Sequence, residues 1–238
     1  MKLQIPSSAS WYDTGSEDAI LSLVGRGSTL PCRSWCPTEL VETPMGRVRV
    51  YNSRSESYTA AARLLRAVRS AGRPSFVWVE SVGKQDDIRS PYQASDPHIV
   101  EFQSALGETI LENLCEVRYL VRVSDTATLE SALHQHVAPF EQAKLYQVRA
   151  AILDQTLNTM SPLIVGDRDT LIGIGRDATM TEACIHLHDQ AATRLVMQYF
   201  ELLWNDRCAV TIRDAGGVSN SAIDLLRNGL LLRQALTS

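Results

Sequence analysis

Strand-like and helix-like patterns alternate along most of this chain, and that alternation limits the folds open to it. Residues 47–51 alternate polar and apolar side chains, as a half-buried strand does, and residues 56–71 repeat apolar side chains at helical spacing. Further strands are expected at residues 75–79, 116–123, 146–152, 163–166, 170–174 and 183–188, and further helices at residues 99–113, 124–134 and 190–205. This order predicts an α/β fold with a mixed sheet flanked by helices on both faces.

The same patterns divide the chain into three parts. Residues 1–46 contain scattered Ser, Gly and Pro and are expected to form an irregular extension with one short helix. Residues 47–207 form the α/β domain, and residues 208–238 form a helical tail. No run approaches the ~18 apolar residues that span a bilayer, and the N-terminus lacks the features of a signal peptide. We therefore expect a cytoplasmic protein with no membrane partner.

The charge balance narrows the choice of partners. Lys and Arg number 23 and Asp and Glu number 27, which gives a formal net charge of −4. A broad nucleic-acid interface needs clustered basic charge, so DNA binding by this chain alone is not expected. The chain has no glycine-rich phosphate loop, and we predict no cofactor. Cys32 and Cys36 lack a second pair of ligands nearby, so we expect a turn with two reduced thiols there.

Three charged residues lie at or near the C-terminal ends of expected strands. They are Glu80, Arg122 and Asp154. Ligands of open α/β sheets usually bind at that edge, which makes Glu80 and Asp154 candidate acids or bases and Arg122 a candidate ligand-binding residue. Each could instead cap a helix or face water.

Two histidines share one strand. His186 and His188 are two residues apart, so their side chains point to the same face. With Asp189 beside them they are candidates for a metal site or for contacts with a ligand. Ordinary hydrogen bonds at a strand edge are the simpler interpretation, and it is the one that we favour.

One stretch resembles the phospholipase D-like family. The family motif is His-x-Lys-x4-Asp on a strand that enters a hairpin, and its best match here is the segment Met160–Asp167, MSPLIVGD. Asp167 takes the place of the family aspartate, which makes it a candidate site residue; a simple role in the turn is the alternative. Met160 and Pro162 replace the nucleophilic histidine and the lysine. Since a thioether cannot be phosphorylated and proline carries no charge, the resemblance implies that phosphodiester hydrolysis is lost.

Three stretches together are similar to the non-catalytic phospholipase D-like sensor domains of actinobacterial TrmB-like and LuxR-like transcription regulators. They are Cys115–Arg122, Tyr146–Arg149 followed by Pro162–Gly173, and Ile185–Gln190 leading to Tyr199–Trp204. The resemblance implies a single phospholipase D-like domain that pairs as a homodimer.

The tail carries one further resemblance. Residues 219–230 are similar to the first helix and turn of a LuxR-type helix-turn-helix, but the chain as given has no room for a recognition helix after them. The DNA reader would then be missing or eroded. An amphipathic helix that packs on the domain or on a partner is an equal alternative.

These observations favour a protein that binds a small ligand or a partner and derives from a transcription regulator. Its candidate ligand-binding residues are Arg122, Asp167, His186 and His188. An alternative is an enzyme of specialised, natural-product metabolism that reuses the pocket for acid–base chemistry. Its candidate catalytic residues are Glu80, Asp154, Asp167 and His188. A DNA-binding transcription regulator is a second alternative, although the charge and the short tail count against it.

Overall fold

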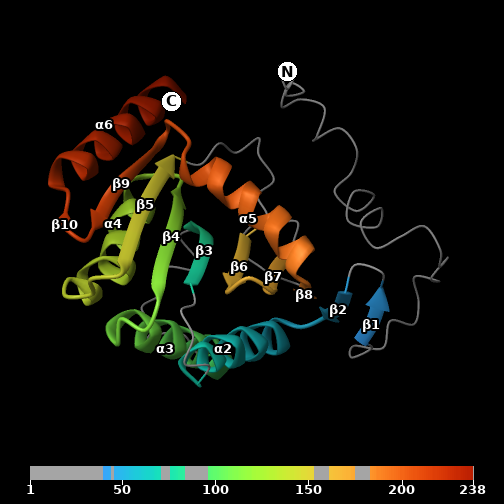
Figure 1. Ribbon diagram of the computed structural model, residues 1–238. Coiled ribbons are helices and arrows are strands. Elements are labelled where there is room, and N and C mark those ends of the chain that lie inside the picture. The colour runs from blue at the N-terminus through green and yellow to red at the C-terminus, as the bar shows by residue number, and fades with distance from the viewer. Residues whose placement is uncertain are drawn as a thin grey trace, which may run out of the picture.

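A ten-stranded mixed sheet forms the centre of the computed structural model, which describes residues 40–43, 46–70, 76–83, 96–152, 161–174 and 183–237. The strand order is β1-β2-β8-β7-β6-β3-β4-β5-β9-β10 (Figure 1). The strands are β1 (Leu40–Thr43), β2 (Gly46–Tyr51), β3 (Phe76–Gly83), β4 (Glu116–Val123), β5 (Tyr146–Ile152), β6 (Ser161–Val165), β7 (Asp169–Ile174), β8 (Ala183–His188), β9 (Ala209–Asp214) and β10 (Gly217–Val218). The helices are α2 (Arg54–Ser70), α3 (Pro97–Leu111), α4 (Thr126–His136), α5 (Gln190–Trp204) and α6 (Asn220–Thr237), with a short 3-10 helix, η3 (Ala138–Phe140).

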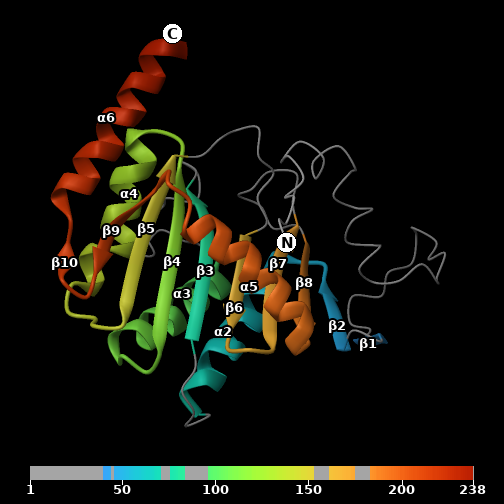
Figure 2. The same ribbon diagram turned by 45° about the horizontal axis from the view of Figure 1, so that its top comes forward.

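Helices cover both faces of this sheet, which confirms the predicted fold class. Helices α2, α3, α4 and α6 pack on one face, and α5 crosses the other (Figures 1 and 2). Neighbouring residues of β3 show how one strand serves two cores. Val77 and Val79 face the four-helix side, whereas Trp78 between them packs against Phe200 and Trp204 of α5. Strands buried on both faces lose the simple alternation of a half-exposed strand.

The parallel part of the sheet is built from consecutive segments. Strand β3 pairs in parallel with β4, and β4 with β5, while the strand pairs outside this group are antiparallel. Parallel neighbours need a crossover connection, and α3 and α4 supply it. Helix α4 starts at a capping box in which Asp125 accepts from the Thr128 amide at 2.7 Å. Asp125 is therefore the N-cap of this helix.

The tail differs from the expected helical segment. Residues 209–214 form β9, which pairs with β5, and β10 pairs with β9, so the helix begins only at Asn220. The strand escaped prediction because a charged residue, Arg213, occupies a buried position in it. Its guanidinium donates to the carbonyls of Tyr146, Phe140 and Ala143, so hydrogen bonds replace the apolar contacts that a core position usually makes.

Helix α6 also differs from a helix-turn-helix. It runs without interruption through Gly229, where the resemblance placed a turn, and it packs on β9, β5 and α4. Figure 2 shows its last turns extending beyond the edge of the sheet. This outcome agrees with the alternative of a helix that packs on the domain.

The N-terminal prediction is tested only in part. Residues 40–43, expected to be irregular, form β1 beside β2. The expected short helix and the pair Cys32 and Cys36 lie outside the described residues. Among the residues that the structure describes, no helix has the length and apolar character needed to span a membrane.

Candidate functional site

Two histidines and one aspartate converge where β7 begins and β8 ends. Nε2 of His186 lies 2.8 Å from Oδ1 of Asp169, and Nδ1 of His188 lies 2.7 Å from the same oxygen. One ligand atom from each of the three side chains falls within 4.8 Å of the other two. We call these three residues the His–Asp cluster. The predicted common face of His186 and His188 is confirmed, since both meet one carboxylate.

Strand pairing explains why Asp169 is the third member. In the antiparallel register of β7 and β8, Asp169 lies opposite His188, and Leu171 lies opposite His186. The hairpin before β7 turns at Gly166, whose φ of 63° belongs to the left-handed region that glycine tolerates best. The Asp189 amide donates to the carbonyl of Arg168 at 2.9 Å and holds this turn against the end of β8. Asp169 is thereby fixed beside the histidines.

Asp189, the predicted third ligand, has another role. Its side chain accepts from the Ala192 amide at 2.8 Å and caps the N-terminus of α5. Capping aspartates satisfy amides that would otherwise have no partner within the helix. The cluster of the described residues therefore contains Asp169 and leaves Asp189 out.

The cluster is open to solvent on one side. The side chains of His186, Asp169 and His188 are 16%, 22% and 46% exposed. Burial acts to raise the pKa of Asp169, but hydrogen bonds and charge from His186 and His188 outweigh it, so that the pKa lies below its ordinary value. The carboxylate is thus ionised at neutral pH.

Positive charge adjoins the cluster on the next strand. In the register of β2 and β8, Arg47 lies opposite His188 and Arg49 lies opposite His186. Directly opposed residues of an antiparallel pair share one face of the sheet. The ring of Tyr51 stacks on His186 at 6.4 Å between centroids. The site therefore combines one carboxylate and two imidazoles with two arginines that share its face on the neighbouring strand.

Asp167 lies in the hairpin turn and outside the cluster. One of its carboxylate oxygens accepts from Nε2 of Gln190 at 2.8 Å. This contact ties the turn to the first residue of α5. It fits the alternative in which Asp167 serves the turn.

Glu80 and Arg122 meet on the opposite face of the sheet. Nε of Arg122 lies 2.8 Å from Oε1 of Glu80, and the two side chains are 9% and 0% exposed. Burial raises the pKa of Glu80 to about 7, against the opposing effects of Arg122 and of a hydrogen bond with Tyr199. The sequence placed each residue at or near the C-terminal end of an expected strand. The structure pairs those two strands and joins the residues as a buried ion pair beneath α5.

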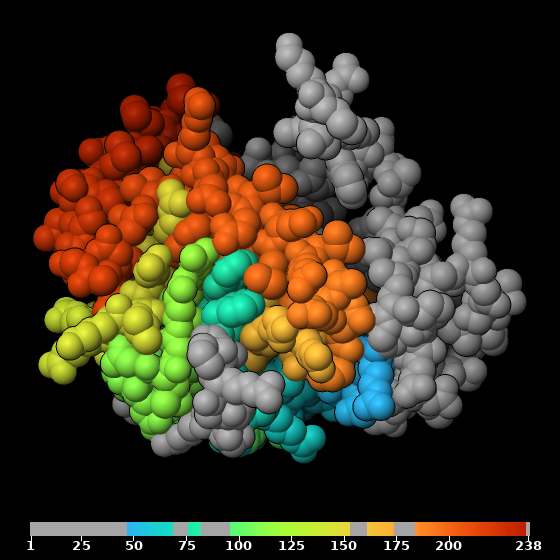
Figure 3. Space-filling view, viewed as in Figure 1, coloured from blue at the N-terminus to red at the C-terminus, as the bar shows by residue number. Residues whose placement is uncertain are grey.

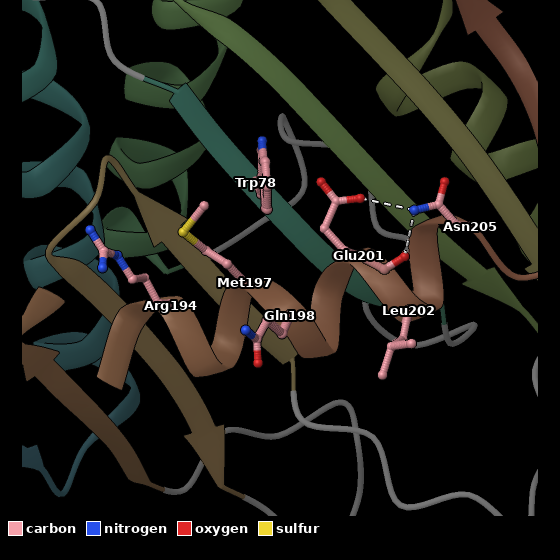
Figure 4. A pocket seen from close by; sticks show the side chains of 7 residues that line it. All are labelled: Trp78, Arg194, Met197, Gln198, Glu201, Leu202 and Asn205. Carbon is pink, nitrogen blue, oxygen red and sulfur yellow. Dashed lines mark hydrogen bonds between the residues drawn. The ribbon is translucent and has the colours of Figure 1, made fainter. Parts of the chain in front are cut away.

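A shallow groove follows the outer side of α5. Its volume is about 750 Å³, and it is lined by Trp78, Arg194, Met197, Gln198, Glu201, Leu202 and Asn205 (Figure 4). Atoms of β3 and β4 remain visible beside α5 in the space-filling view (Figure 3). Next to the groove, the Arg118 guanidinium lies 4.9 Å from the Trp78 ring and 2.8 Å from Glu201. Arg118 could not be singled out from the sequence, because these partners come from two distant segments, β3 and α5.

The remaining predicted residues are more dispersed. Pro162 is buried in β6 opposite Ile172 of β7. Met160 and Asp154 lie outside the described residues. Asp169 was missed as a site residue: it directly precedes the strand expected at residues 170–174, and nothing in the sequence placed that strand beside the histidines of residues 183–188.

Comparisons with known proteins give distant structural likeness. No family model matches the chain, and no curated protein matches it. Among solved structures, the chain is similar to TrmBL2, an archaeal chromatin protein, at 13% identity and a TM-score of 0.41, covering 69% of this chain and 54% of that one. It is similar to NucT from Helicobacter pylori at 11% and 0.41, covering 69% and 98%.

A third similar structure is a polyphosphate kinase from Porphyromonas gingivalis, at 12% identity and a TM-score of 0.42, covering 81% of this chain and 29% of the kinase. The chain thus spans about half the length of the TrmBL2 chain and less than a third of the kinase.

Proposed function

We propose that this protein binds a small ligand at the His–Asp cluster and does not hydrolyse phosphodiesters. The observation that carries the proposal is the convergence of His186 and His188 on one oxygen of Asp169, at 2.8 and 2.7 Å. Three polar groups of this kind, held on strands and open to solvent, form a preorganised binding site. The resemblance to sensor domains of regulators suggests that the ligand acts as a signal.

The absence of phosphodiester chemistry is proposed from the residues that the family mechanism needs. Met160 and Pro162 stand where the resemblance expects a nucleophilic histidine and a charge-stabilising lysine. We expect bis(4-nitrophenyl) phosphate to be hydrolysed no faster with the protein than in buffer alone. A rate of hydrolysis above that of buffer, lost in His188→Ala, would contradict this part of the proposal.

Binding is tested by native mass spectrometry of the freshly purified full chain, with release of any bound species by denaturation. We expect a mass above that of the polypeptide, which His186→Ala loses. His134→Ala is the matched control, since His134 is an exposed histidine of α4 away from the cluster. The proposal would be refuted if the purified chain carried no bound species and if no metal ion, anion or metabolite in a test panel raised its melting temperature.

A further inference from the structure

We propose that the His–Asp cluster is a site for a divalent transition-metal ion, with zinc as its closest match. This inference rests on the proposed function, since it names the ligand class of the same site. Its ligands are Oδ1 of Asp169, Nε2 of His186 and Nδ1 of His188. Two imidazoles and one carboxylate form a donor set that Zn²⁺ takes up readily.

The distances fit an ion with little rearrangement. Ligands at about 2.0 Å from a tetrahedral zinc lie about 3.3 Å apart. The two nitrogens now lie 2.8 and 2.7 Å from the aspartate oxygen, so each N–O pair must open by about 0.5 Å to reach that tetrahedral spacing. The ligand atoms of all three side chains already lie within 4.8 Å of one another. Small rotations of the side chains supply that movement.

The hydrogen bonds within the cluster do not prevent binding. A neutral imidazole that donates one N–H to Asp169 can carry its proton on the other ring nitrogen instead. The nitrogen that faces the carboxylate then offers a lone pair to the ion. The exchange requires only a change of tautomer at His186 and His188, and the ionised Asp169 supplies negative charge.

Three protein ligands leave a fourth position free. Because His188 is 46% exposed, that position faces solvent on the His188 side of the cluster. Zinc sites with three protein ligands commonly bind water or an exchangeable ligand there. Arg47 and Arg49 lie opposite the two histidines on the same face of the sheet, and positive charge on that face favours an anion as the additional ligand. The same arginines weaken binding of a bare cation, so we expect moderate affinity.

The test is calorimetric titration of Zn²⁺ into the chelator-treated full chain. We expect one ion per chain, and at least a tenfold loss of affinity in Asp169→Asn, His186→Ala and His188→Ala. Asp167→Asn and His134→Ala are matched controls that should bind as the wild type does. Circular dichroism verifies that each variant is folded. Since His188 is the most exposed ligand, His188→Ala remains informative if the other two cluster variants fail to fold.

Cysteine thiols are the competing zinc ligands in this chain. A variant with Cys32, Cys36 and Cys208 replaced by Ser should retain the affinity of the wild type. Binding of Co²⁺ should give a visible spectrum without the near-ultraviolet charge-transfer band of a thiolate ligand. Loss of zinc binding in the cysteine variant would overturn the inference, and so would equal affinity in the wild type and the three cluster variants.

A parallel titration with inorganic phosphate separates this inference from the proposed function. If phosphate binds, the cluster variants lose it, and zinc does not bind, then the metal inference fails and the proposed binding function stands. If neither probe binds, no species co-purifies with the chain and the panels of ions and metabolites fail to stabilise it, both fail.

Discussion

Glu80 is an acidic residue whose buried environment disfavours its ionised form. Its side chain is fully buried, and burial raises its pKa to about 7 although Arg122 favours the charged form. In a buried ion pair, the cost of removing the charges from water competes with their mutual attraction, and here the cost is the larger effect on the pKa of Glu80. Near neutral pH, Glu80 is therefore close to the midpoint of its titration.

Glu80 gives the protein a stability that depends on pH. An acid whose pKa is higher in the folded state stabilises the fold fully below its unfolded value of 4.5, and this contribution is lost as the pH rises towards about 7. We expect the free energy of unfolding of the wild type to fall by about 1–3 kcal/mol more than that of Glu80→Gln between pH 5 and 7.5. Urea unfolding at the two pH values measures the difference. Parallel curves for the two proteins would contradict the assignment.

His136 produces the opposite trend. Its ring stacks on Tyr119 with 4.4 Å between centroids, and burial lowers its pKa to about 4. A base with a depressed pKa stabilises the fold above 6.5, and this contribution is lost as the pH falls. We expect His136→Phe, which keeps the stacking, to lose about 1–2 kcal/mol less stability than the wild type between pH 7 and 4.5. Exposed His134, replaced by Phe, is the control, and an equal effect there would refute the interpretation.

The residues of the site could be predicted only where local geometry decides their position. The two-residue spacing of His186 and His188 fixed their common face, because side chains of any strand alternate. Asp169 depended on the register between two strands, which the sequence does not state. Asp189 adjoins His188 in sequence but caps α5, since a free helix N-terminus competes for a carboxylate.

At the scale of elements, Gly229 shows how one residue can suggest two structures. The resemblance implied a helix and a turn within residues 219–230, and glycine is common in turns. In the structure it lies inside α6, where a Cβ atom would stand 3.0 Å from Cδ1 of Ile152 in β5. The small residue therefore allows the helix to approach the sheet. Only the packing of α6 on β5 distinguishes this role from a turn.

Enlarging that residue should separate helix and sheet. We expect Gly229→Leu to lower the free energy of unfolding by about 1–3 kcal/mol, the usual cost of overpacking. Gly229→Ala should change it by less than about 1 kcal/mol, because the gain in helix propensity offsets the close contact. Denaturant unfolding of both variants measures the effect. A neutral Gly229→Leu would show that α6 does not pack closely on β5.

The start of α4 offers a second prediction at this scale. The Asp125 carboxylate accepts amide hydrogen bonds at the first turn, and these hold its pKa below the ordinary value although burial acts to raise it. We expect Asp125→Ala to cost about 1 kcal/mol of stability, and Asp125→Asn, which keeps a capping oxygen, to cost less. Thermal unfolding compares them. Equal losses would mean that charge matters more than the cap.

At the scale of the whole molecule, side chains from the C-terminal tail, residues 208–238, form part of the hydrophobic core. Ile212, Ile223, Leu226 and Leu230 are at most 5% exposed and belong to the core of the four-helix face. Burial of each such side chain is worth roughly 1.5–3 kcal/mol, so together they equal a typical net stability. We expect a chain cut after Arg207 to aggregate or to lose cooperative unfolding. A soluble, cooperatively folding product would support the predicted boundary at residues 207 and 208.

The fold class could be predicted because the apolar residues of most helices and strands recur with the period of that element. Strands β4 and β5 have the predicted bounds, and helices α2 to α5 differ from theirs by a few residues at their ends, whereas α6 starts well after the expected beginning of the helical tail. Strand order could not be predicted, since it depends on contacts between distant segments such as β2 and β8. The expected homodimer stays a prediction, and sedimentation velocity tests it.

The pairing of β2 with β8 also has a consequence for synthesis on the ribosome. The β1–β2 hairpin emerges early, but its partner in the sheet is made only after five more strands have followed. An isolated hairpin is barely stable in water, and closing so long a loop is slow. We therefore expect the nascent chain to carry an unsatisfied strand edge for most of its translation. That interval is when the protein is most open to aggregation and to capture by chaperones.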